Sequence, residues 1–196
     1  MNAIVKPKSH IVKPGNGIVF MKVGTHANES LEKIIERKSR ELRDAGVIFW
    51  GYGGNTCHPV SVVKPFAAER KTSGHEIFLV MEPMDSKHFA EATIAEEYSA
   101  DGVTWTKIPA GVNVLGSRYA LVLGSLDRQD FEIDLSKMHV AVGTCQGRPA
   151  AEYVKGRVDK GCFIVDKAAS AASMEPVPKH IGLVANLKAP YAVLLR

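Results

Sequence analysis

The sequence predicts a single α+β domain whose sheet is mixed, mostly antiparallel and strongly curved. An apolar run, a helical pattern and a second apolar run follow one another between residues 17 and 50, in the order of a β-α-β unit. Beyond residue 92 the apolar runs are short and separated by turn residues, which is typical of strands. The 196 residues fit one ordinary domain, and 45% hydrophobic content is enough for a core.

The first strand and the helix after it are expected at Gly17–Val23 and at Glu29–Ala45. The strand is a continuous apolar run, GIVFMKV, and the helix has apolar residues at helical spacing with charged residues between them. Asn28 or Thr25 can cap the start of the helix, and Gly46 is suited to end it.

A second strand is expected at Val47–Trp50. Because the intervening helix is long enough for a crossover, we expect this strand to pair in parallel with the first one. Pro59 and Pro65 can each start a short helix, and the apolar run EIFLVM predicts a third strand at Glu76–Met81.

The sequence pattern of the second half of the chain predicts mainly strands. Asp101-Gly102 indicates a tight hairpin, because a primed two-residue turn needs positive φ at both central positions. A short helix is expected to start at Pro149. The predicted strands are 94–98, 103–108, 119–123, 131–135, 139–142 and 162–165.

Proline and small polar residues divide the chain into four parts. The stretch DKAASAASMEPVP is typical of a connector, and the apolar runs after it are expected to pair with the main sheet or with a partner, including a second copy of the chain. The expected parts are a flexible N-terminal arm (1–16), the α+β domain (17–165), a linker (166–178) and C-terminal strands (179–196).

Charge and cysteine content restrict the class of protein. A net charge of +4 and a pI near 8.9 suit a phosphate-bearing partner but fall short of a dedicated duplex-DNA binder. Three cysteines far apart, with no Cys-x-x-Cys pair, suggest neither a disulfide framework nor a zinc site, so we expect no metal, no cofactor and a cytoplasmic location. Lysines and prolines interrupt the N-terminal segment, and no later run has the roughly 20 apolar residues of a membrane span.

The segment VIFWGYGGNTCHP, residues 47–59, is the main candidate for a binding site. Glycine lets the backbone approach a ligand closely, although the spacing matches no dinucleotide or P-loop motif. An exposed aromatic ring between glycines can stack on a nucleotide base. We therefore expect an exposed loop beside a pocket, with ligand-binding residues Gly51, Tyr52, Gly53, Gly54 and His58.

A basic segment after residue 147 is the second candidate. The basic residues near the helix start expected at Pro149 outnumber the acidic ones. They are Arg148, Lys155, Arg157 and Lys160, against Glu152 and Asp159. Arginine near a helix N-terminus suits phosphate, which makes Arg148 and Arg157 candidate ligands. A solvated surface with internal ion pairs explains the same pattern.

The adjacent Cys57 and His58 form the candidate catalytic pair. Neighbouring side chains on an extended segment point to opposite faces, so a base from elsewhere in the fold would have to activate Cys57. A packing role for Cys57 is favoured, and no catalytic residue is assigned.

The order of strand, helix, strand ending in tryptophan and then antiparallel strands resembles the PUA-like folds, which include the nucleic-acid-reading EVE and YTH domains. This resemblance rests on element order alone. It favours a non-enzymatic binding module of a bacterium or phage that recognises a nucleotide, a nucleic acid or a protein that handles one. The alternatives are a Cys/His-dependent transferase or hydrolase, and a protein-directed interaction or inhibitor protein.

Overall fold

The computed structural model describes residues 7–53, 56–87, 93–155, 158–167 and 175–196. Its strands are β1 (Gly17–Thr25), β2 (Ile48–Gly51), β3 (Ile77–Lys87), β4 (Glu97–Ser99), β5 (Thr106–Lys107), β6 (Tyr119–Leu123), β7 (Asp127–Asp134), β8 (Met138–Val140), β9 (Lys160–Val165) and β10 (Pro178–Leu195). Its helices are α1 (Lys8–Ile11), α2 (Leu31–Ala45), α3 (Lys64–Thr72) and α4 (Ala150–Tyr153), with a π-helix η1 (Pro59–Val63) and a 3-10 helix η2 (Leu135–Lys137).

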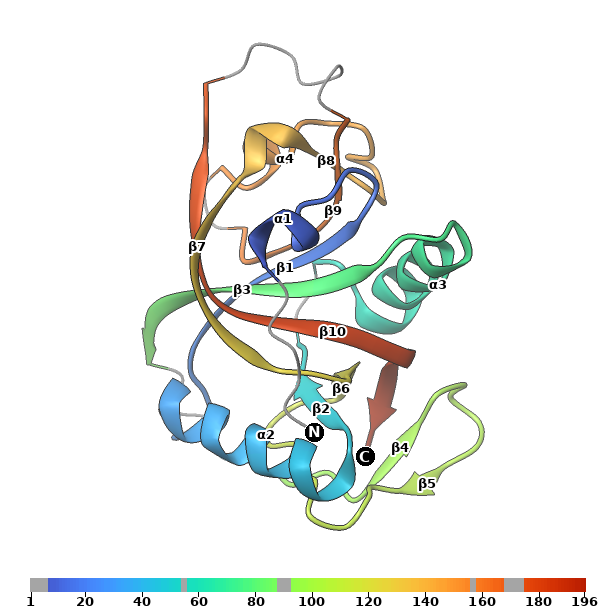
Figure 1. The fold of residues 1–196 in the computed structure, drawn as a ribbon. Coiled ribbons are helices and arrows are strands. Elements are labelled where there is room, and N and C mark those ends of the chain that lie inside the picture. The colour runs from blue at the N-terminus through green and yellow to red at the C-terminus, as the bar shows by residue number, and fades with distance from the viewer. Residues whose placement is uncertain (1–6, 54–55, 88–92, 156–157, 168–174) are drawn as a thin grey trace.

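All ten strands belong to one open, curved sheet (Figure 1). The main order is β2-β6-β10-β3-β1-β9-β8, and β4, β5 and β7 are attached beside this path. Among the strand pairs of the described residues, β1 and β3 run parallel and the others run antiparallel. The predicted α+β class with a mixed, mostly antiparallel curved sheet is therefore confirmed.

The predicted parallel pairing of the first two strands is wrong. β1 pairs with β3 on one side, beginning at Gly17 opposite Ile77, and with β9 on the other. β2 pairs with β6 instead, and β6, β10 and β3 lie between β2 and β1. Parallel strands need a crossover connection, and here that connection is longer than predicted. It runs through α2, β2, η1 and α3, so that β3 and not β2 lies beside β1.

β10 occupies the middle of the sheet although it is the last element of the chain. Its first half pairs with β3 and β7, and its second half pairs with β6 and β4. The register against β6 shifts between Leu187 and Ala192, and Tyr191 has a φ of 68°, so the strand bends between its two halves (Figure 1). The C-terminal apolar runs thus lie within the sheet of their own chain.

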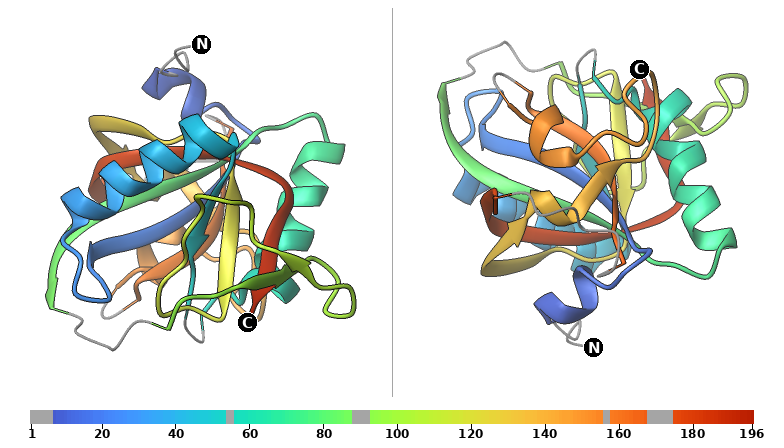
Figure 2. Two further views of the ribbon diagram at one scale, coloured as in Figure 1. Left: turned by 90° about the horizontal axis from the view of Figure 1, so that it is seen from below. Right: turned by 90° about the horizontal axis from the view of Figure 1, so that it is seen from above.

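Alternation along the central strands divides most of the core into two layers, and a third cluster lies around Phe49 and Val122. Val19 and Leu79 face one layer, which α2 and α3 cover, whereas Ile18 and Phe78 face the other, which α1 and α4 cover. Figure 2 shows α2 lying across the strands. Ile11 of α1 is completely buried in the second layer, so the chain is already packed within the segment expected to be a flexible arm.

Local capping signals place the ends of α2. Gly46 closes the helix with a φ of 68°, as predicted, and its N–H donates to the carbonyl of Leu42. At the start, Ser30 is the cap instead of Asn28 or Thr25, and its side chain accepts a hydrogen bond from the N–H of Lys33.

The hairpin predicted at Asp101-Gly102 is formed by β4 and β5, but its turn is longer than two residues. Glu97 pairs with Lys107 and Tyr98 with Thr106, which leaves residues 100–105 as the loop. The Asp101 carboxylate accepts hydrogen bonds from the N–H groups of Val103 and Thr104. This side chain organises the turn that a primed two-residue turn would otherwise supply.

Candidate functional site

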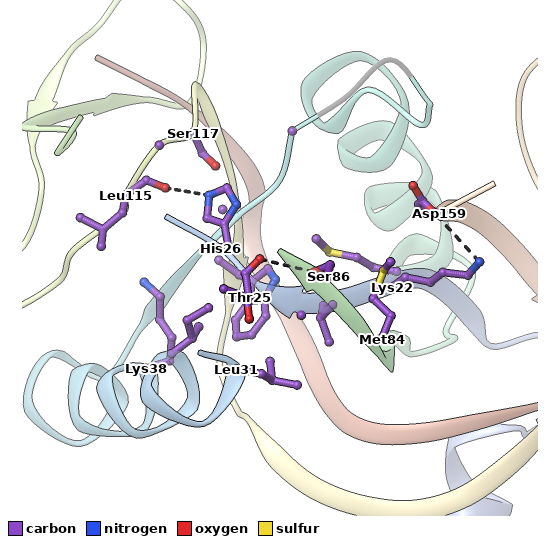
Figure 3. A pocket seen from close by; sticks show the side chains of 18 of the residues that line it. Lys22, Thr25, His26, Leu31, Lys38, Met84, Ser86, Leu115, Ser117 and Asp159 are labelled. Atoms are coloured by element: carbon purple, nitrogen blue, oxygen red, sulfur yellow. Dashed lines mark hydrogen bonds and ion pairs between the residues drawn. The ribbon is translucent and has the colours of Figure 1, made fainter. Parts of the chain in front are cut away.

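A pocket with a volume of about 460 Å³ opens between the end of β1, the first half of α2 and the loop 114–117 (Figure 3). β1 and β3 contribute Val23 and Met84, α2 contributes Leu31, and β2 contributes Trp50. These residues meet here because alternate side chains of the strands face α2. The size is in the range of sites for small organic ligands, and much of the wall is apolar.

Five basic side chains line this pocket, against one carboxylate, that of Asp159. They are Lys22, His26, Arg37, Lys38 and Lys160. Since buried cations are usually paired, their partners decide which of them can bind a ligand. Lys22 lies 3.8 Å from Asp159, and the ring of His26 hydrogen-bonds the carbonyl of Leu115 at 3.2 Å (Figure 3).

Lys38 holds the pocket wall together. Its side chain is 3% exposed, and its ammonium donates to Glu41 at 2.8 Å, to the carbonyl of Phe49 at 2.7 Å and to that of Asn113 at 2.6 Å. Arg37 supports the same contacts by pairing with Glu41. Burial lowers the pKa of Lys38 to about 8, against the opposing effect of Glu41. Lys38 therefore joins α2 to β2 and to the chain before the 114–117 loop.

Lys160, the first residue of β9, also lines the pocket but has a different setting. Its ammonium lies 5.1 Å from the centre of the Tyr52 ring, a cation–π contact. Burial lowers the pKa of Lys160, and the nearby Asp159 and Cys57 oppose that shift. A half-buried ammonium whose close contact is an aromatic ring retains hydrogen-bond donors for an anion.

The glycine segment contributes two of its predicted residues to the pocket, Gly51 and Gly53. A side chain at Gly51 would lie 2.7 Å from the Ser117 hydroxyl, so close approach does require glycine there. Gly53 has open space around it and lies outside the left-handed region, so its conformation does not require glycine. Gly54 lies outside the described residues.

The prediction that Tyr52 is exposed is wrong. Its side chain is 0% exposed, and its hydroxyl has no hydrogen-bond partner among the residues that the structure describes. Tyr52 belongs to the core layer that α2 and α3 cover, and the ammonium of Lys160 on β9 lies over its ring. Residues far along the chain thus help to bury a side chain that its neighbouring glycines suggested was exposed.

The remaining predicted residues do not line this pocket. Nδ1 of His58 accepts a hydrogen bond from the N–H of Ser61, 3.3 Å away, and so caps η1, while the ring packs against Tyr119. Arg148 is exposed on the loop before α4 and lies 4.0 Å from Glu152. The two side chains form an ion pair on the surface of the protein. Arg157 lies outside the described residues.

A second cluster, the thiol cluster, consists of Cys57, Cys162 and Tyr153 and borders Lys160. Hydrogen bonding from the Cys162 side chain is the main cause that lowers the pKa of Cys57 to about 7, and Tyr153 and Lys160 add to it. The pKa of Cys162 is raised, and burial together with Cys57 raises that of Tyr153 to about 12. The Cys57 thiol is therefore the group of the cluster that ionises first.

The sequence placed Lys160 in the basic segment but not beside the glycine segment, and it gave no sign of the thiol cluster, because the members of both groups are far apart along the chain. One signal was available. Lys160 and Cys162 are two positions apart, and β9 begins at Lys160, two residues before the strand predicted at 162–165, so their side chains share a face.

Comparison with family models, with curated proteins and with solved structures finds no match for this chain. In the part of the chain that the structure describes, no group of three or more histidine, cysteine or acidic side chains could hold a metal ion. Over the same residues, the helices lack the length and apolarity of a bilayer span.

Proposed function

We propose that this protein is a non-enzymatic binding module whose pocket takes a small anionic ligand with a flat apolar part, and that a nucleotide is the class of ligand. The observation that carries the proposal is a pocket lined both by the half-buried ammonium of Lys160 and by apolar side chains around Trp50. The ammonium would bind phosphate and the wall would bind the base.

The apolar wall suits a planar group. Met21 and Met84 line the pocket together with Trp50, and the flexible thioether side chains of methionine adapt to the shape of a ligand. Met84 is 40% exposed and so lies at the opening of the pocket. A base packed between these side chains would be removed from water on its apolar faces.

The likeness in element order to PUA-like folds favours a nucleotide or nucleic acid over other anions. This likeness concerns the order of the elements along the chain and not the strand pairing, in which β1 and β2 are not neighbours. The same proposal places the protein in the cytoplasm of a bacterium or in a phage-infected cell, in keeping with its three free cysteines.

Titration with mononucleotides tests the proposal. We expect AMP, GMP, CMP or UMP to bind at low salt, about 50 mM, with the matching nucleoside at least about tenfold weaker, because the nucleoside lacks the charge that Lys160 would bind. Lys160→Met should weaken binding of the best mononucleotide by about tenfold or more, a loss of about 1.4 kcal/mol. Calorimetric titration measures both effects.

Lys107→Met is the matched control, because Lys107 is exposed on β5 and does not line the pocket. The Lys107→Met variant should bind the best mononucleotide with the same affinity as the unmodified protein. Absence of binding by every mononucleotide at millimolar concentration, or equal affinity of the Lys160→Met variant, would rule the proposal out.

The Cys/His-dependent transferase or hydrolase is the second candidate, and the ionisable Cys57 favours it. His58 gives it less support, since its Nδ1 caps η1. Chemical conversion of a bound nucleotide that is lost in Cys57→Ser would establish this candidate in place of the binding module.

A further inference from the structure

Cys57 and Cys162 are brought together from two distant parts of the fold. Cys57 lies just before η1 with a φ of 53°, a conformation uncommon for a residue other than glycine. Cys162 lies within β9, between β1 and β8, and is 1% exposed. Cys57 packs against the core layer that α2 and α3 cover, in which Cys162 is buried, and hydrogen bonding from Cys162 is the main cause that lowers the pKa of Cys57.

We propose that Cys57 is a peroxide-reactive thiol and that Cys162 is its resolving partner, so that oxidation by a hydroperoxide joins the two residues in an intramolecular disulfide. This proposal does not rest on the ligand of the pocket. The two thiols differ in access in the way that such a pair requires, because Cys57 is half-buried and can meet a small oxidant whereas Cys162 is buried.

The surroundings of Cys57 favour the reactive form of its thiol. A thiolate is the nucleophile, and a neighbouring cation or hydrogen-bond donor stabilises it. Cys57 has the Lys160 ammonium as a cation and the Cys162 thiol and the Tyr153 hydroxyl as donors. Asp159 also lies near Lys160 and reduces its positive field, but it is exposed on the solvent side.

The chemistry has two balanced steps. The Cys57 thiolate attacks one oxygen of the hydroperoxide, the O–O bond breaks, and the sulfenic acid of Cys57 forms with release of an alcohol or water once a proton is taken up. The Cys162 sulfur then attacks the Cys57 sulfur, the S–O bond breaks, and water leaves with the proton of the Cys162 thiol. The two electrons that reduce the peroxide come from the two thiols.

Cys145 supplies an internal comparison. It packs against the other core layer, and its sulfur lies 3.9 Å from the Arg148 guanidinium on an exposed loop. A general sensitivity of thiols to peroxide would oxidise Cys145 as well, whereas the proposed pair would leave it reduced.

The experiment treats the full chain with hydrogen peroxide at pH 7 and follows each cysteine by peptide mass spectrometry. We expect a Cys57–Cys162 disulfide in the unmodified protein, at a rate at least about tenfold above oxidation of Cys145. Cys162→Ser should accumulate a sulfenic acid on Cys57 that dimedone traps, and Cys57→Ser should form no disulfide. Cys145→Ser should behave as the unmodified protein.

Because Cys162 is buried, Cys162→Ala is made alongside the serine variant, and circular dichroism shows which of the two is folded. If Cys57 is oxidised no faster than Cys145, the proposal fails. Persistence of the Cys57 sulfenic acid in the folded unmodified protein would also overturn it, because Cys162 would then not resolve it. Neither result depends on nucleotide binding.

Discussion

Lys38→Met is expected to lower the free energy of unfolding by about 3–5 kcal/mol, because it leaves the carboxylate of Glu41, 2% exposed, without one of its two cations. It also removes the donor that joins the carbonyls of Phe49 and Asn113. Denaturation by urea measures the loss. Arg128→Met, which breaks the exposed ion pair with Glu32, is the control and should leave the midpoint nearly unchanged.

A double variant tests whether the loss of stability comes from leaving the Glu41 carboxylate without Lys38 or from losing the ion pair itself. In Lys38→Met/Glu41→Leu both buried charges are gone, so it should be more stable than Lys38→Met alone. A single variant as stable as the unmodified protein would show that this network does not support the fold.

The same lysine should make stability depend on pH. Burial lowers its pKa in the folded protein from 10.5 to about 8, so between these values the unfolded chain binds more protons than the folded one. Stability due to Lys38 therefore rises as the pH rises from about 8 towards about 10.5. The rise should be smaller in Lys38→Met when both proteins are denatured by urea across this range. Equal slopes would contradict the lowered pKa.

Ala185→Asp should be at least as damaging, with an expected loss of about 4 kcal/mol or more, because it places an unpaired carboxylate in the middle of the sheet. Ala185 is 0% exposed in β10 and pairs with Leu79 of β3. Thermal unfolding followed by circular dichroism measures the effect. Lys188→Asp introduces the same side chain at an exposed position of the same strand and should unfold close to the unmodified protein. Equal melting of the two variants would refute the central place of β10.

Sequence reasoning was most successful where the determinants are local. The apolar run of β1 and the glycine that ends α2 depend on neighbouring residues, and both were predicted. The partner of β1 was not, because it depends on where β10 inserts, and no local pattern specifies that. Tyr52 was placed on the surface for the same reason, since Lys160 on β9 covers it.

The candidate site was predictable only in part. Gly51 and Gly53 were found because glycine next to a strand end is a local signal. The cations opposite them come from β1, α2 and β9, and Cys57 meets Cys162 only in the folded chain. Such groups are identified by tertiary contacts rather than by spacing along the sequence.

Lys160 couples the pocket and the thiol cluster electrostatically. Its ammonium lines the pocket and also lowers the pKa of Cys57. An anion bound to Lys160 would offset that positive field, raise the pKa of Cys57 and slow its oxidation. Linkage requires the converse effect as well. A disulfide carries no charge, so its formation removes the thiolate that competes for the Lys160 ammonium and strengthens the binding of the anion. The occupancy of the pocket by an anion and the redox state of Cys57 would then influence each other through the side chain of Lys160.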